Sequence, residues 1–187
     1  ARVVLASILC LYGEKGAASI VANAVRQEKG WDEGWHYTGM GQFGMCMSRL
    51  DALVMALGNA KDPASLAVIL EKARLLCPED YFSHYRAISE AAEAIGSKEA
   101  VPTLAMLLTA PGVRCHSLKD YVEARREAVP DMNDTSTRNI ALKELHLARA
   151  LYLCGDKEGI GKAVLERYAK GLQGHYARYA YEVLQGK

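Results

Sequence analysis

The chain has 187 residues, of which 50% are hydrophobic and 24% are charged, and its formal net charge is +1. This length is enough to bury a substantial core, and the composition is typical of a soluble globular domain, not of a disordered segment. Lys and Arg are scattered and nearly balanced by Asp and Glu. The basic face that binds phosphate backbones is therefore missing, so we expect no nucleic-acid partner.

The first apolar run, residues 3–13, is too short to cross a membrane, which takes about 20 residues. No small-residue cleavage site follows it, so it also differs from a signal peptide. We therefore expect no membrane span, and the compartment stays open between the cytoplasm and an exported location. Because the chain starts at Ala1 within an apolar pattern, we expect a fragment of a longer protein or a processed form.

Four segments of the chain repeat one apolar pattern in front of a glycine. The positions one, four, five and eight residues before the glycine are apolar in each copy, which is one face of a helix. A glycine can adopt the left-handed conformation that ends a helix, so we expect a helix to end at each. The glycines and their apolar positions are Gly13 with Tyr12, Leu9, Ile8 and Leu5; Gly58 with Leu57, Val54, Leu53 and Leu50; Gly96 with Ile95, Ala92, Ala91 and Ile88; and Gly155 with Cys154, Leu151, Ala150 and Leu147.

A second helix is expected after each glycine. Asp62 followed by Pro63, and Ser97, are typical of helix N-termini. Apolar residues then recur eight, eleven and twelve positions after the first three glycines, at Val21, Ala24 and Val25; Leu66, Ile69 and Leu70; and Leu104, Leu107 and Leu108. Neither helix of a pair can bury its apolar face alone, so stacked pairs would share one core.

These patterns predict an all-α superhelix, or solenoid, of about four helical pairs over residues 1–187 as one domain. A capping helix is expected at the C-terminus, with Tyr176, Tyr179, Ala180 and Val183 on one face. Insertions are expected at about 29–47 and 112–137, and the second insertion should hold a helix at about 117–128. No segment alternates convincingly, so strands should be nearly absent.

The stretch AAEAIGSKEAVPTLAMLL (residues 91–108) resembles a HEAT repeat of the short bacterial type, which also occurs in phycobilisome lyases. A narrower resemblance is carried by GWHYTGMGQFG (34–44), SHYRAISEAAEAIG (83–96) and LARALYLCGDKEGIGKAVLERYAKGLQGHYARYAYEVL (147–184). Together these segments resemble the C-terminal helical region of bacterial FAD-dependent oxidoreductases, some of them described as xanthan lyases. This resemblance implies an accessory domain of a flavoprotein, with FAD in the parent protein and no cofactor in this chain.

Gly39, Gly41 and Gly44 have the G-x-G-x-x-G spacing of a dinucleotide-binding loop. The preceding residues do not form an apolar strand, and the next helix is expected only from about Ser48, so the elements of a nucleotide site are missing. The stretch is better interpreted as part of a long loop rich in aromatic rings. Its candidate interaction residues are Trp31, Trp35, His36, Tyr37 and Phe43. Two interpretations stay open: the rings pack over the neighbouring helices, or they form a docking surface.

We expect neither a catalytic residue nor a metal site. The five cysteines are widely spaced, without a C-x-x-C pair, and no histidine has the spacing of a catalytic triad. His84, Arg86, His175 and Arg178 lie at expected helix starts and are further candidates for a binding surface, because such positions can present donors to an anion.

The expected function is therefore a non-catalytic interaction or accessory domain. Its partner would be a protein surface, either the parent's own N-terminal flavin domain or another protein. Two alternatives stay open: a free-standing repeat scaffold that binds a protein or peptide, and a small enzyme of the bilin-lyase kind.

Overall fold

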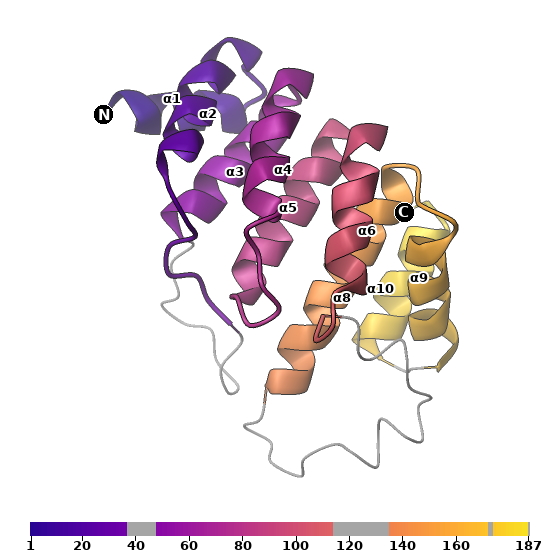
Figure 1. Cartoon of the computed structure of the whole chain (residues 1–187). Helices are drawn as coiled ribbons and strands as arrows, with labels where there is room; N and C mark the ends of the chain where they lie inside the picture. The colour runs from indigo at the N-terminus through magenta and orange to yellow at the C-terminus, as the bar shows by residue number, and fades with distance from the viewer. Residues whose placement is uncertain (37–47, 114–134, 172–173, 187) are drawn as a thin grey trace.

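The computed structural model describes residues 1–36, 48–113, 135–171 and 174–186 (Figure 1). Within these ranges the regular elements are helices and no strand is present, which confirms the all-α prediction. Gly39, Gly41, Gly44, Tyr37, Phe43 and the helix expected at about 117–128 lie outside the described residues. The α-helices are α1 (Arg2–Leu11), α2 (Ala18–Gln27), α3 (Arg49–Ala60), α4 (Leu66–Ala73), α5 (Phe82–Ile95), α6 (Val101–Thr109), α8 (Ser136–Leu153), α9 (Ile160–Gly171) and α10 (His175–Leu184).

The helices pack in chain order. α1, α3, α5 and α8 lie side by side, and each contacts the next. α2, α4 and α6 form a second layer across them, and short 3-10 turns at Lys15–Ala17, Pro63–Ser65 and Lys98–Ala100 lead into these three helices. α9 packs on α8, and α10 packs on α9, so the two termini lie at opposite ends of the molecule (Figure 1).

The second-layer helices bury the residues that the repeat pattern singled out. The predicted apolar residues of α2, α4 and α6 are 0–6% exposed, and all belong to one core. The predicted caps are also present. Asp62 accepts a hydrogen bond from the Ala64 N–H at 3.1 Å, and the Ser97 hydroxyl accepts one from the Glu99 N–H at 3.2 Å. Local sequence therefore fixes where these helices begin.

The first-layer helices bury their predicted faces in three of the four copies. In α3, α5 and α8 these residues are buried, apart from the half-buried Ile95. In α1 the corresponding Leu5, Ile8, Leu9 and Tyr12 are exposed, and only Ala6 and Cys10 of this helix are buried. The expectation that the first copy also buries its apolar face is therefore wrong, because among the described residues no helix lies on that side of α1.

Two of the repeat glycines behave differently. Gly96 ends α5 in the left-handed conformation (φ 68°), as predicted. Gly58 instead lies inside α3, which continues to Ala60 and ends at Lys61 in the left-handed conformation. A Cβ atom at Gly58 would lie 2.4 Å from the Cα atom of Ala91, so this glycine is required by the close approach of α3 and α5 and not by a turn.

The C-terminal helix α10 has the predicted orientation. Its Ala180 and Val183 are buried, and Tyr176 and Tyr179 are half-buried against the core. α10 therefore covers the last part of the core, whereas the outer face of α1 at the other end stays open.

Candidate functional site

The described part of the aromatic loop folds back onto α4 and α5. The Trp31 ring stacks on the His84 imidazole with 4.4 Å between ring centroids, and its Nε1–H donates to the carbonyl oxygen of Lys72 at 3.2 Å. The backbone of Trp35 exchanges two hydrogen bonds with Ser83, at 3.1 and 3.2 Å. Both indole rings are half-buried. Of the two interpretations of the loop, packing over neighbouring helices therefore describes Trp31 and Trp35.

The buried side chain of His84 contacts the aromatic loop from the core side. Its side chain is 1% exposed, with Nδ1 2.7 Å from Oδ1 of Asp51 and Nε2 3.1 Å from the carbonyl oxygen of Asp32. Both ring nitrogens face acceptor oxygens, so either both carry a proton or the Asp51 carboxyl group is protonated and donates to Nδ1. His84 lies near the start of α5, as expected, but its side chain faces inward and not toward a partner.

Gly34 is the point of closest approach between the loop and α5. A Cβ atom at Gly34 would lie 2.6 Å from Cε1 of His84 and 2.6 Å from the Ser83 hydroxyl oxygen. Any larger residue would push the loop away from the buried His84 ring. Gly34, the first glycine of the GWHYTGMGQFG stretch, therefore has a structural role.

His36 accepts a hydrogen bond at the start of α5. Its Nδ1 atom lies 3.1 Å from the Phe82 N–H, and its ring stacks on Tyr81 at 4.9 Å. Burial, and then the positive charge of Lys143, lower the pKa of His36. The neutral ring that results is the form that can accept the Phe82 hydrogen bond, so His36 acts as a cap of α5.

The remaining predicted residues lie apart from this loop. Arg86 is half-buried and pairs with Glu90 one turn later at 2.7 Å. His175 and Arg178 are exposed on the first turns of α10. Of these three residues, His175 lines the cavity described next.

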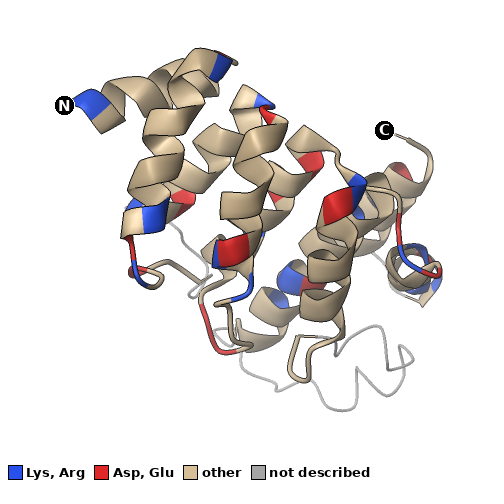
Figure 2. Ribbon diagram, turned by 45° about the horizontal axis from the view of Figure 1, so that its top comes forward, with Lys and Arg blue, Asp and Glu red and all other residues tan. Residues whose placement is uncertain are grey.

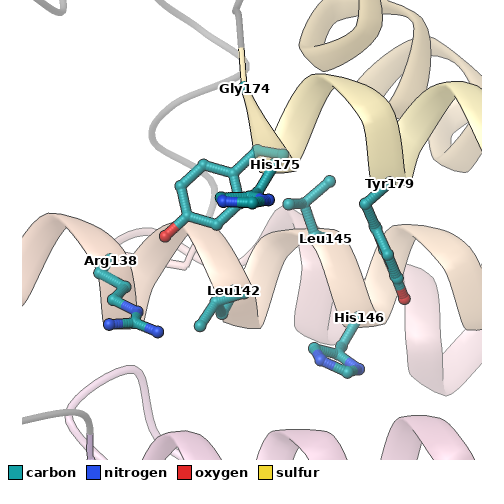
Figure 3. A pocket seen from close by; sticks show the side chains of 8 residues that line it. Arg138, Leu142, Leu145, His146, Gly174, His175 and Tyr179 are labelled. Atoms are coloured by element: carbon teal, nitrogen blue, oxygen red, sulfur yellow. The ribbon is translucent and has the colours of Figure 1, made fainter. Parts of the chain in front are cut away.

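A cavity of about 700 Å³ opens between α8 and α10 (Figure 3). This volume is in the range of small-molecule sites, and a mostly apolar wall with a few polar groups is typical of them. Its described lining is formed by Arg138, Leu142, Leu145 and His146 of α8, and by Gly174, His175, Tyr176 and Tyr179 at the start of α10.

His146, which lines this cavity, was not among the predicted site residues. It lies between Phe82 of α5 and Tyr179 of α10, with ring centroids at 5.6 and 6.1 Å. Burial, followed by the positive charges of Arg86 and Arg149, lowers the pKa of His146 to about 4, so the ring is neutral at pH 7. Its only sequence signal is a position next to the apolar face of α8.

Arg149 joins three helices beside the cavity. It donates two hydrogen bonds to the Glu93 carboxylate on α5, at 2.8 and 2.9 Å, and its guanidinium group lies 5.6 Å from the Tyr179 ring on α10. The His and Tyr rings in the lining of the cavity could stack on an aromatic group of a ligand. Within its described lining there is no carboxylate, Ser or Cys side chain.

The outer side of α1 forms a second candidate surface, here called the α1 face. Its apolar side chains are between 41% and 85% exposed, and they belong to α1 and to Tyr12, the residue that follows its last turn. Most of the other helices carry charged residues (Figure 2), whereas α1 carries none after Arg2 and α6 carries none at all. Contiguous exposed apolar surface of this kind is typical of protein interaction sites. The α1 face consists of Val4, Leu5, Ile8, Leu9, Leu11 and Tyr12.

Comparisons with family models, with curated protein sequences and with solved structures gave no match. In the described ranges no group of three or more His, Cys, Asp or Glu side chains could hold a metal ion. A search of the same ranges for a helix long and apolar enough to span a membrane found none.

Proposed function

We propose that this chain is a helical-repeat interaction domain that binds another protein surface and performs no chemistry of its own. The observation that carries this proposal is the α1 face, where apolar side chains that are buried at the equivalent positions of three later helices are exposed. A large exposed apolar surface costs free energy in water, so its usual role is to be covered by a partner.

The repeat architecture supports the proposal. The order in which α1, α3, α5 and α8 pack, with a second layer across them, agrees with a HEAT-like solenoid of helical pairs closed at one end by α10. In such a protein each pair buries its apolar faces on its neighbours, and the surfaces left over bind partners. The solenoid assignment itself rests on the sequence resemblance and this packing order.

The resemblance to the C-terminal region of bacterial FAD-dependent oxidoreductases extends the proposal. In that group a flavin fold lies N-terminal to the helical region, and the α1 face is at the N-terminal end of this chain. We therefore propose an accessory domain whose partner is the flavin-binding domain of the parent protein, with FAD bound there and not in this chain.

The reading frame upstream of Ala1 provides the first test. We expect it to encode an apolar strand, a G-x-G-x-x-G turn and a helix, in that order. A start codon immediately before Ala1 would exclude the accessory-domain proposal. It would leave the free-standing scaffold, which binds a protein or peptide, as the alternative.

Binding between the two halves provides the second test. The upstream half and this chain, expressed together as separate polypeptides, should copurify, and Leu5→Glu with Ile8→Glu should abolish this. Met106→Glu is the matched control, because Met106 is an exposed apolar residue on α6, 48% exposed. Equal loss from the control, or no loss from the α1 variant, would contradict docking through the α1 face.

The cavity between α8 and α10 favours the scaffold alternative. A scaffold would bind a peptide side chain or small aromatic group there, at the end of the molecule opposite the α1 face. Leu142→Trp would narrow this cavity without changing α1. Partner binding that is lost with Leu142→Trp and kept with Leu5→Glu and Ile8→Glu would support the scaffold.

A further inference from the structure

α5 and α8 each contact the first-layer helix before them through particular positions of the repeat. In α1 the same positions belong to the α1 face. The junction between α3 and α5 gives the geometry. Asp51 meets His84 near the first turns of these helices, and Gly58 meets Ala91 near their last turns, so the two helices run in the same direction. Ala91 is thus the residue through which α5 contacts the preceding helix, and it lies five positions before the repeat glycine Gly96.

The junction between α5 and α8 has the same register. Cys154, one position before the repeat glycine Gly155, donates through Sγ to the carbonyl oxygen of Ala92 at 3.5 Å. The residues five and one positions before Gly13 in α1 are Ile8 and Tyr12. These two side chains of the α1 face therefore point to where a preceding helix lies in the later junctions.

The size of the side chains also matches. The corresponding face of α3 consists of Leu50, Leu53 and Leu57, all buried, and α1 packs on α3. The side chains that α1 itself buries are small, namely Ala6 and Cys10. α1, with small buried side chains four residues apart, thus packs beside α3, which has large aliphatic side chains on the corresponding face. The exposed α1 face also carries large aliphatic side chains, so it would fit a preceding helix with small ones.

We propose that the α1 face binds a helical pair of the same repeat type, presented by the protein partner, whose first helix runs parallel to α1. Small side chains of that helix, four residues apart, lie over Leu5, Ile8 and Tyr12. The contact continues the established packing of α1 on α3, and it is uncharged because α1 carries no charge after Arg2. This inference rests on the proposed function and specifies the segment of the partner that meets α1.

The experiment adds such a pair to the full chain. A second copy of residues 1–28, which include α1 and α2, is placed before Ala1 and joined by a flexible Gly/Ser linker. The added Ala6 and Cys10 then supply the small side chains. The melting temperature should rise by about 5 °C, since each kcal/mol shifts it by roughly 2–4 °C in a chain of this size. Amide exchange in the original α1 should slow as well.

Two variants show whether the α1 face is responsible. Ile8→Glu in the original α1 should remove the gain in melting temperature, and Met106→Glu should keep it. Ala6→Lys with Cys10→Lys within the added copy should also remove the gain. Because Ile8 is 45% exposed and Met106 is 48% exposed, the substituted chains should fold.

Three outcomes would overturn the inference. The first is an unchanged melting temperature in the extended chain, and the second is a gain that survives Ile8→Glu. The third is sedimentation of the unextended chain as a dimer that Ile8→Glu separates, because the occupant would then be a second copy. If the upstream half still requires Leu5 and Ile8 for binding in any of these cases, the proposed accessory function stands and only the helical-pair occupant is lost.

Discussion

The junction between α3 and α5 and the junction between α5 and α8 share one type of contact, which different residues make. Twelve positions before its repeat glycine, the second helix of each junction carries a buried basic side chain. This side chain contacts the loop that leads into the first helix of the junction. In α5 this is His84, which contacts the carbonyl oxygen of Asp32 at 3.1 Å. In α8 it is Lys143, whose ammonium group donates to the carbonyl oxygens of Pro78 at 2.8 Å and Asp80 at 2.5 Å.

The two junctions differ at one position of their first helix, seven residues before its repeat glycine. In α3 the residue at this position is Asp51, whose carboxylate pairs with His84. In α5 it is Ser89. Among the described residues the buried Ser89 hydroxyl has no hydrogen-bond partner. Burial lowers the pKa of Lys143 to about 8, although the charges of Asp80 and Glu79 act in the opposite direction. The carbonyl contacts to the loop are thus common to both junctions, and a charge partner on the neighbouring helix is not.

The largest effect is expected when the charge partner of the first junction is removed. Asp51→Ala leaves the Nδ1 atom of the buried His84 ring without its hydrogen-bond partner and should lower the free energy of unfolding by about 4 kcal/mol at pH 7, measured by guanidinium denaturation. Glu93→Ala removes the carboxylate that bonds Arg149 in the second junction. It should cost only about 1 kcal/mol, because that pair is partly exposed.

A double substitution separates pairing from packing. Asp51→Met with His84→Phe replaces both partners by apolar groups and should recover part of the loss, since no buried polar group is then left unpaired. Equal losses from Asp51→Ala and from the double variant would mean that the pair itself is not what holds the loop.

The next effect extends the comparison to α1, which has no preceding helix among the described residues. Leu147 of α8 and Leu5 of α1 both lie eight positions before a repeat glycine, yet Leu147 is 0% exposed and Leu5 is 61% exposed. Leu147→Ala should cost about 3 kcal/mol of unfolding free energy, and Leu5→Ala less than about 0.5 kcal/mol. Similar costs for the two variants, measured by the same denaturation, would show that the α1 face is covered in solution.

The smallest effect concerns the pH dependence of the second junction. Between pH 8 and 10.5 the unfolded chain keeps a proton on Lys143 that the folded chain has released, so the free energy of unfolding should rise with pH across this window. The pKa difference corresponds to a rise of at most about 3 kcal/mol, which denaturation at several pH values measures. Lys143→Met should remove this rise, and the difference between the two curves cancels the other titrating groups.

Ser89→Asp would give the second junction the charge partner of the first one. It should raise the pKa of Lys143 above 8 and reduce the rise in stability with pH, because a carboxylate favours the charged ammonium form. A pH dependence identical to that of the unsubstituted chain would show that position 89 does not face Lys143, so the two junctions would be alike only in their loop contacts.

The helices could be predicted from the sequence because their signals are local. The caps at Asp62 and Ser97 and the apolar spacing of α2, α4 and α6 depend on residues within a few turns, and the structure agrees with all of them. Gly58 shows the limit. The sequence favoured a helix end there, whereas the close contact with Ala91, 33 residues later, requires a glycine inside the helix.

The candidate sites were predicted less well, because a side chain's role depends on which distant groups meet it. The sequence around His84 and around His146 does not indicate which residues they contact: His84 contacts Asp51, and His146 lies between Phe82 and Tyr179. Neither contact could be inferred without the packing of α5 between α3 and α8. Trp31 and Trp35 were identified as unusual, and only the tertiary contacts decide that their rings pack inward.

The sequence by itself determined that this protein is built from helices with repeated apolar faces, because hydrophobic periodicity and capping act within a single helix. Tertiary structure decided which of these faces are buried. The same four positions are buried in α3, α5 and α8, apart from the half-buried Ile95, and exposed in α1, since burial depends on whether a neighbouring helix is present and not on the pattern itself.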